Sequence, residues 1–197
     1  MSMILDPFER DLLLEVASIA AGKSIAPITN VTGQTVTIIP PRLILDHMEK
    51  IADSMGHPED LKTVVFIRII GDAHGAVVLL IDPENLNILL PHIENNLKIS
   101  ALEEITNIIS GASLGGLSNF LGLELLQSTP HSATDMLRAV VNEIVTEVGI
   151  SNAQILCFAI HLKVGPTSVP ITLYMMFDDI SSAKILESGK KHIEKNT

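Results

Sequence analysis

An internal repeat is the feature of this sequence that most constrains its fold. When the 197-residue chain is shifted by 89 positions along itself, identical residues coincide over an ungapped stretch. Glycine and proline take part in these coincidences, and both residues fix backbone geometry. The identical pairs include Leu13/Leu102, Glu15/Glu104, Ile19/Ile108, Gly22/Gly111, Ser24/Ser113, Gly33/Gly122 and Pro41/Pro130. We therefore expect one domain over residues 1–197, built from two similar halves at about 6–93 and 95–193.

The first half predicts a helix, a strand, a second helix, a strand hairpin and a third helix. Asp6-Pro7-Phe8-Glu9 combines an N-cap, a first-turn proline and a capping-box glutamate. A helix is therefore expected to begin there and to end near Pro27. The expected elements that follow are a strand at 34–39 ended by Pro40-Pro41, a helix at 43–55, strands at 63–70 and 76–81, and a helix from 82.

The same order of elements returns in the second half. The expected elements are a helix at 97–121, a strand at 124–128, a helix at 133–148, strands at 153–163 and 170–177, and a last helix from about 179. Strands that alternate with helices in both halves predict an α/β fold with one continuous mixed or antiparallel sheet.

Composition and charge exclude several classes of partner. Apolar residues make up 47% and charged residues 18%, which is typical of a globular protein. The net charge is −10 and no Lys/Arg cluster is visible, so nucleic acid and anionic membranes are poor candidates. Cys157 is the only cysteine and lies in an apolar run, which predicts a buried core thiol. Charged residues interrupt the N-terminal segment and the apolar stretch at 64–81, so we expect a cytosolic protein without membrane insertion.

The expected helix at 97–121 carries a group of polar residues on one face. At 100° per residue, Ser100, Glu104 and Asn107 fall within an arc of about 60°, while apolar residues such as Leu102 lie on the opposite side. Two plainer interpretations exist. Ser100 could be an N-cap that forms a capping box with Glu103, and Glu104 and Asn107 could be solvated surface residues.

The spacing of these residues extends to a proline. The pattern Ser100-x3-Glu104-x2-Asn107-x22-Pro130 resembles the motif of the CheC/CheX/FliY phosphatases, in which Asp or Ser, Glu, Asn and Pro stand at these separations. The helix sequence around Glu104 is also similar to the helix of that family. A glutamate and an asparagine at this spacing are a weak signal alone, whereas the same 31-residue frame occurring twice is a strong one.

The second occurrence of the frame lies in the first half. It reads Asp11-x3-Glu15-x2-Ser18-x22-Pro41, and two such motifs are typical of CheC, so the resemblance extends over nearly the whole chain. Ser18 departs from the family's asparagine, because a hydroxyl is shorter and lacks the planar donor and acceptor of an amide. We expect this degenerate second site to be weak or inactive in catalysis, while Glu15 remains able to dock a partner.

The resemblance implies a phosphatase that acts on the aspartyl phosphate of a CheY-type response regulator in chemotaxis or motility signalling. Asn107 would orient the attacking water, and Glu104 would bind the regulator's active-site lysine. Ser100 and Pro130 would support the site. A Mg²⁺ ion is expected on the regulator, so the protein needs no cofactor of its own, and the spacing of its seven histidines predicts no metal site.

The resemblance also implies a pseudo-two-fold arrangement, with the two long motif helices on the outer face of the sheet. An alternative function remains open, namely a binding module for phosphorylated CheY or for the receptor deamidase CheD, with little or no turnover. The two functions differ at Asn107, because catalysis requires its amide and docking does not. A small-molecule hydrolase has little support, because no nucleophile–base pair or metal cluster is visible.

Overall fold

Helices and strands cover most of the computed structural model, which describes residues 3–149 and 154–196. In chain order the elements are α1 (Pro7–Thr32), β1 (Val36–His47), η1 (Met48–Lys50), α2 (Ile51–Met55), β2 (Leu61–Gly71), β3 (Gly75–Ile81), α3 (Pro83–Leu89), η2 (Asn95–Leu97), α4 (Lys98–Leu121), β4 (Leu125–Gln127), β5 (His131–Met136), α5 (Leu137–Val148), β6 (Gln154–Val164), β7 (Val169–Phe177) and α6 (Asp179–Asn196). The predicted strand at 153–163 begins at Gln154, and residue 153 lies outside the described residues.

The strands form one antiparallel sheet that joins both halves of the chain. Over the described residues it has seven strands in the order β1-β6-β7-β3-β2-β4, with β5 also paired to β2. The order is symmetric, because β1 lies beside β6 of the other half and β4 and β5 lie beside β2. β3 and β7 meet in the middle, where Val78 faces Tyr174. The predicted continuous sheet is therefore confirmed, and it is antiparallel.

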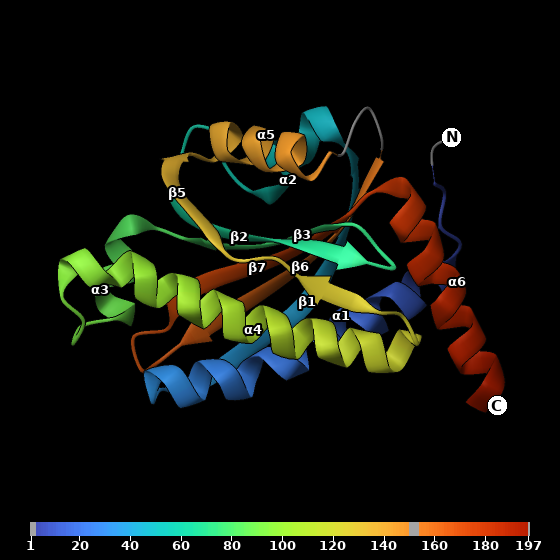
Figure 1. Ribbon diagram of the computed structural model, residues 1–197, viewed down its shortest axis with the longest axis horizontal. Helices are drawn as coiled ribbons and strands as arrows, with labels where there is room; N and C mark the ends of the chain where they lie inside the picture. Colours follow the sequence, from blue (N-terminus) through green and yellow to red (C-terminus); the bar gives the residue numbers. More distant parts are fainter. Residues whose placement is uncertain (1–2, 150–153, 197) are drawn as a thin grey trace.

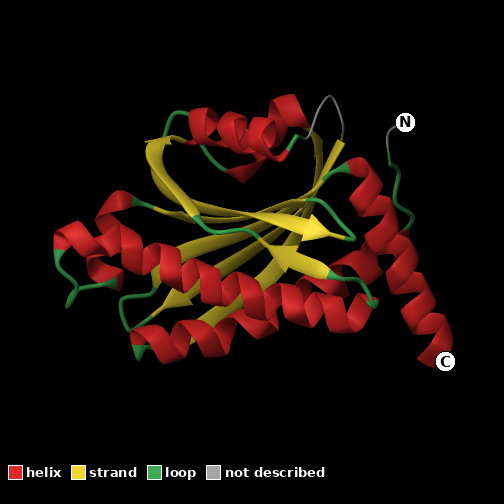
Figure 2. Ribbon diagram, in the orientation of Figure 1, coloured by secondary structure: helices red, strands yellow, loops and turns green. Residues whose placement is uncertain are grey.

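Helices cover both faces of this sheet (Figure 1). α1 and α4 lie on one face, and α2 and α5 lie on the other, so the strands form the middle layer (Figure 2). The core has two parts accordingly, and the residues of β6 alternate between them. Phe158 packs on the side of α1 and α4, whereas its neighbours Cys157 and Ala159 pack on the side of α2 and α5. Cys157 is fully buried as predicted, and this burial raises the pKa of its thiol.

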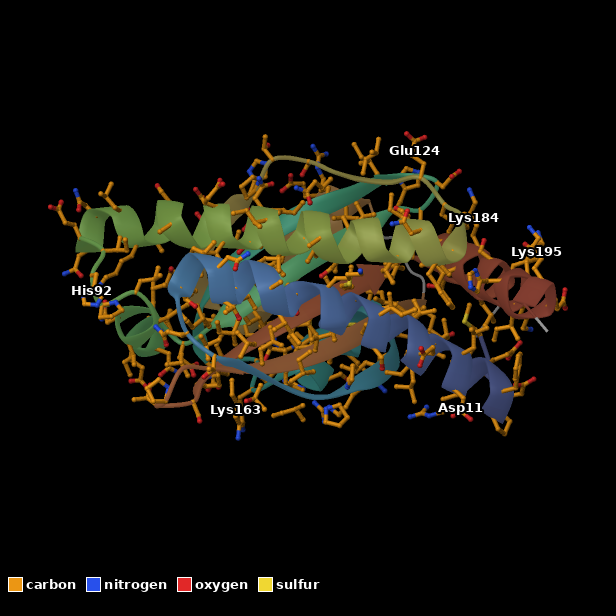
Figure 3. The ribbon with its side chains drawn as sticks, turned by 90° about the horizontal axis from the view of Figure 1, so that it is seen from below. Asp11, His92, Glu124, Lys163, Lys184 and Lys195 are labelled. Carbon is orange, nitrogen blue, oxygen red and sulfur yellow. The ribbon has the colours of Figure 1, made fainter. Side chains whose placement is uncertain are left out.

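The two long helices α1 and α4 pack side by side and run in opposite directions (Figures 1 and 3). Small residues at the contact bring the backbones close: the buried Ser113 hydroxyl donates to the carbonyl of Ala20 at 3.0 Å. A Cβ atom added to Gly116 would lie 2.7 Å from Cγ of Lys23, so a larger residue there would displace the Lys23 side chain. The predicted arrangement of two long motif helices on the outer face is confirmed.

The glycine pair of the internal repeat ends these two helices in the same way. Gly33 and Gly122 have φ values of 66° and 65°, in the left-handed region that glycine adopts without strain. Each glycine N–H donates to a carbonyl four residues earlier, that of Thr29 at 2.8 Å and that of Ser118 at 2.9 Å. At the other end of α1, the predicted capping box is present, with Asp6 accepting from the Glu9 N–H at 2.8 Å.

Two predicted boundaries in the first half are wrong. α1 continues through Pro27 to Thr32, because the following turn buries Ile28 completely and this burial offsets the lost hydrogen bond. β1 also continues through Pro40-Pro41, where the register against β6 shifts between Ile39 and Arg42. An edge strand with such an irregularity accommodates proline, since the missing N–H has no ladder partner to lose there.

The helices predicted at 43–55 and 133–148 begin later, and their first residues belong to strands. Residues 43–47 extend β1, and α2 begins only at Ile51; residues 131–136 form β5, and α5 begins at Leu137. In β1, Leu43 and Leu45 pack toward α1 and α4, whereas Ile44 packs toward the other face. A short apolar run is compatible with a helix or with a strand. Here the pairing with β6 or β2 makes these residues strands.

α1 is long and apolar enough to cross a membrane by length and composition alone. In the structure it packs against α4 and the sheet, and eight of its residues are buried there. This packing is that of a core helix in a folded domain.

A buried hydrogen bond joins the central strand β7 to the short helix α2. The hydroxyl of Tyr174, which is 1% exposed, donates to the carbonyl of Met55 at 2.7 Å, and burial raises the pKa of this phenol. Replacing Tyr174 with phenylalanine keeps the ring and leaves the buried carbonyl unpaired, so we expect the free energy of unfolding to fall by about 1 kcal/mol. Urea unfolding followed by circular dichroism measures this change. An unchanged midpoint would show that the carbonyl finds another donor.

Candidate functional site

The first half of α4 carries the motif residues on its solvent side. Ser100 and Glu104 are exposed and Asn107 is half-buried. Ser100 lies inside the helix, because α4 begins at Lys98 and its N-cap position, Leu97, makes no side-chain cap. The interpretation of Ser100 as an N-cap is therefore wrong.

The two adjacent glutamates of α4 have different surroundings. Glu103 is half-buried, and its carboxylate accepts a hydrogen bond from the hydroxyl of Ser132 in β5 at 2.6 Å. Glu104 is exposed, and no hydrogen bond or ion pair joins its carboxylate to another of the described residues. Glu103 thus holds α4 to the sheet edge, whereas Glu104 is available to a cation from outside the molecule.

Asn107 is held by a residue that the sequence analysis did not identify. The side-chain Nε2 of Gln127, in β4, donates to Oδ1 of Asn107 at 2.7 Å and to its backbone carbonyl at 3.2 Å. The sequence holds one signal of this contact, since Gln127 is a polar residue in an otherwise apolar strand. Spacing alone could not show that its side chain turns toward α4.

Pro130 lies in the break between β4 and β5, opposite α4. Hydrogen bonds at three positions tie α4 to this edge: the two of Gln127 to Asn107, that of Ser132 to Glu103, and that of the Leu125 N–H to the Ser118 hydroxyl at 3.2 Å. β4 and β5 both pair with β2, and the chain between them leaves the ladder around Pro130. A proline without an N–H suits such an interruption. Its place is thus structural, between the two strands that hold the motif helix.

The first-half motif lies on α1, toward the opposite end of the helix layer. Asp11, Glu15 and Ser18 are all exposed, and Asp11 lies toward the end of α1 that is near α6 (Figure 3). The hydroxyl of Ser18 donates to the carbonyl of Leu14 in its own helix at 2.8 Å. Pro41 is half-buried at the irregularity of β1. Because α1 and α4 run in opposite directions, the two motifs do not form one site.

No group of three or more His, Cys, Asp or Glu side chains in residues 3–149 and 154–196 has an arrangement that could hold a metal ion. The chemistry available at the α4 motif is therefore that of an amide, a carboxylate and a hydroxyl on the solvent side of a helix. Such a surface suits contact with another macromolecule better than enclosure of a small substrate.

Comparison with known proteins identifies relatives of this chain, although no family model matches it. The CheY-P phosphatase CheC of Bacillus subtilis (strain 168) is 26% identical over 153 residues, which cover 68% of this chain and 70% of CheC. The crystal structure of FliY from Thermotoga maritima matches with a TM-score of 0.75 at 19% identity, over 96% of this chain and 100% of the crystallised chain. The chain is thus similar in sequence to CheC and in fold to FliY.

The fold of this chain is also found in FliM. The FliM middle domain from H. pylori matches with a TM-score of 0.63 at 10% identity, over 93% of this chain and 99% of that domain. At this identity the likeness concerns the fold alone. The same architecture thus carries different surfaces in different proteins, and function has to be argued from the residues on α1 and α4.

Proposed function

We propose that this chain hydrolyses the aspartyl phosphate of a CheY-type response regulator in chemotaxis or motility signalling. The observation that carries the proposal is the pairing of an oriented amide with a free carboxylate on one exposed helix face. Asn107 is held through its Oδ1 by Gln127, and Glu104 lies three residues earlier without a partner among the described residues. The relative CheC, a CheY-P phosphatase, supports the same activity here.

The proposed reaction needs little chemistry from this protein. The regulator already has a lysine and a Mg²⁺ ion beside its aspartyl phosphate. Hydrolysis therefore requires only a correctly positioned water molecule and room for in-line attack. The water oxygen bonds to phosphorus, the bond from phosphorus to the aspartyl oxygen breaks, and the aspartate leaves as a carboxylate. The water's protons remain on the released phosphate and solvent. The amide of Asn107 orients that water without adding charge near the phosphoryl group.

Glu104 supplies the docking contact in this proposal. Its carboxylate forms a charge-assisted hydrogen bond with the regulator's active-site lysine, which fixes the register of the complex and places Asn107 over the phosphorus atom. The net charge of −10 makes nucleic acid an unsuitable partner. The site would operate in the cytoplasm, where phosphorylated regulators act.

A binding module is the second candidate, and the first-half motif favours it. Glu15 is exposed there, but the Ser18 hydroxyl bonds to its own helix, so this surface keeps a docking carboxylate without an amide beside it. Such a surface would hold a phosphorylated regulator, or CheD, without hydrolysis. The two functions differ in how many regulator molecules lose their phosphate per molecule of this protein. A phosphatase acts on many, whereas a binding module acts on none.

The test is the decay of phosphorylated CheY from the same organism, with the regulator in large excess over this protein. We expect the whole regulator pool to lose its phosphate faster, because each molecule acts many times. Binding is measured in parallel with regulator held in its activated form by beryllofluoride. Phosphorylation-dependent binding without faster decay would replace the phosphatase by the binding module.

A further inference from the structure

We propose that Gln127 is the positioning residue of the active site: it fixes which end of the Asn107 amide faces the phosphoryl group. This inference rests on the proposed phosphatase function and adds a residue outside the motif of Ser100, Glu104, Asn107 and Pro130. Gln127 does not need to touch the regulator. It acts through Asn107.

The hydrogen bonds of Gln127 determine the orientation of both amides. Its Nε2 lies 3.2 Å from the backbone carbonyl of Asn107, and a carbonyl oxygen can only accept. The nitrogen end of the Gln127 amide must therefore face α4. The Asn107 atom 2.7 Å from the same Nε2 must then be the acceptor Oδ1, because two NH₂ groups would repel each other. Both N–H groups of Gln127 are used in this way, and the NH₂ group of Asn107 is left for the reaction.

The other end of Gln127 shows that the arrangement has a cost. Its Oε1 is buried and has no hydrogen-bond partner among the described residues. A buried carbonyl without a donor destabilises a protein, and most such oxygens are paired in folded structures. Turning the amide over would not help, because it would set Oε1 against the carbonyl of Asn107. The side chain keeps an unpaired oxygen and holds Asn107, as expected for a residue with a functional role.

The strand that carries Gln127, β4, is itself held in place. Gln127 pairs with Ile69 of β2, and Leu126 pairs with Ile70. β4 is thus held in the ladder of the sheet. A side chain on such a strand can set the position of an amide within the tolerance that in-line attack demands.

The first half of the chain provides an internal comparison. At the same offset of 89 residues, Ser18 stands for Asn107 and Ile38 stands for Gln127. Ile38 packs against the hydrophobic core and has no donor, and Ser18 bonds to Leu14. The second half therefore has both the amide of Asn107 and the glutamine that binds it, and the first half has neither. This joint difference is expected if the two residues act as a pair.

The test compares three variants by kinetics with phosphorylated CheY. Gln127→Leu removes the donor at similar size, and Gln127→Glu replaces it with a carboxylate that repels Oδ1. We expect each to lower kcat about tenfold while KM and binding of the beryllofluoride-activated regulator stay unchanged. Ser118→Ala is the matched control, because it removes another hydrogen bond between α4 and β4 without touching Asn107. It should leave kcat unchanged.

A second readout does not depend on activity. The measurement is the NMR chemical shift of the two side-chain NH₂ protons of Asn107, whose signals are identified by their loss in Asn107→Ala. In the wild type the two protons should have distinct chemical shifts. In Gln127→Leu both shifts should change and become more alike. This holds even if the wild type proves to be a binding module, so failure of the phosphatase proposal is distinguishable from failure of this one. Unmoved Asn107 signals in Gln127→Leu would overturn the inference. So would a loss of kcat in Ser118→Ala equal to that in Gln127→Leu.

Discussion

Replacement of Asn107 by alanine is expected to lower the rate of regulator dephosphorylation about 100-fold, with binding of the activated regulator nearly unchanged. The physical reason is that the amide contacts the water in the transition state, whereas docking depends on Glu104. The fold should persist, because Asn107 is a half-buried helix residue whose only described side-chain partner is Gln127. The rate of phosphate release and a binding titration, measured on the same preparation, separate the effect on catalysis from the effect on binding.

Ser18→Ala is the matched control for this experiment. It removes a side chain at the same place in the repeat, and its hydroxyl bonds only to the carbonyl of Leu14 among the described residues. We expect turnover to change by less than about twofold. If Ser18→Ala instead removed most of the activity, the catalytic centre would lie on α1, and the proposed roles of the two halves would have to be exchanged.

Replacement of Glu104 by lysine is expected to weaken binding of the activated regulator more than about 100-fold and to abolish turnover at ordinary concentrations. Charge reversal turns an attraction for the regulator's lysine into a repulsion. Glu104 is exposed and unpaired among the described residues, so the thermal stability of the variant should equal that of the wild type. Calorimetric titration measures the affinity, and a thermal melt provides the check on folding.

The neighbouring glutamates supply the controls for Glu104. Glu103→Gln removes one negative charge one position away and keeps an acceptor for the Ser132 hydroxyl, so binding should be retained. Glu15→Lys tests the first-half motif in the same assay. Wild-type affinity in Glu104→Lys, together with weak binding in Glu15→Lys, would show that the regulator docks on α1.

Local signals predicted the elements that depend on local chemistry. The capping box at Asp6 and the left-handed glycines Gly33 and Gly122 fix helix ends through contacts within a few residues. The length of α4 and the polar face with Glu104 and Asn107 follow from the same kind of periodicity. The internal repeat predicted one sheet shared by two halves, and the strand pairing confirms that sheet.

Contacts between distant residues decided what the sequence left open. Residues 43–47 and 131–136 are strands because β6 and β2 offer them hydrogen-bonding partners more than 60 residues away in the chain. Gln127 was missed for the same reason, since its amide meets Asn107 only after β4 has been placed beside α4. Pairing partners of this kind leave no periodic trace in a single sequence.

The symmetric strand order has a consequence for how the two halves can change. Each half contributes its outer strand to the hydrogen-bonded ladder of the other, as an arm-exchanged dimer would, but within a single chain. Neither half can therefore be discarded, even where Ser18 and Ile38 have replaced the amide pair. If the proposed function holds, the molecule is a half-of-the-sites enzyme. Its inactive site is fixed by the amino-acid sequence and does not depend on which site has bound a ligand. One half then remains as scaffold, and its exposed α1 surface is open to acquire a different partner.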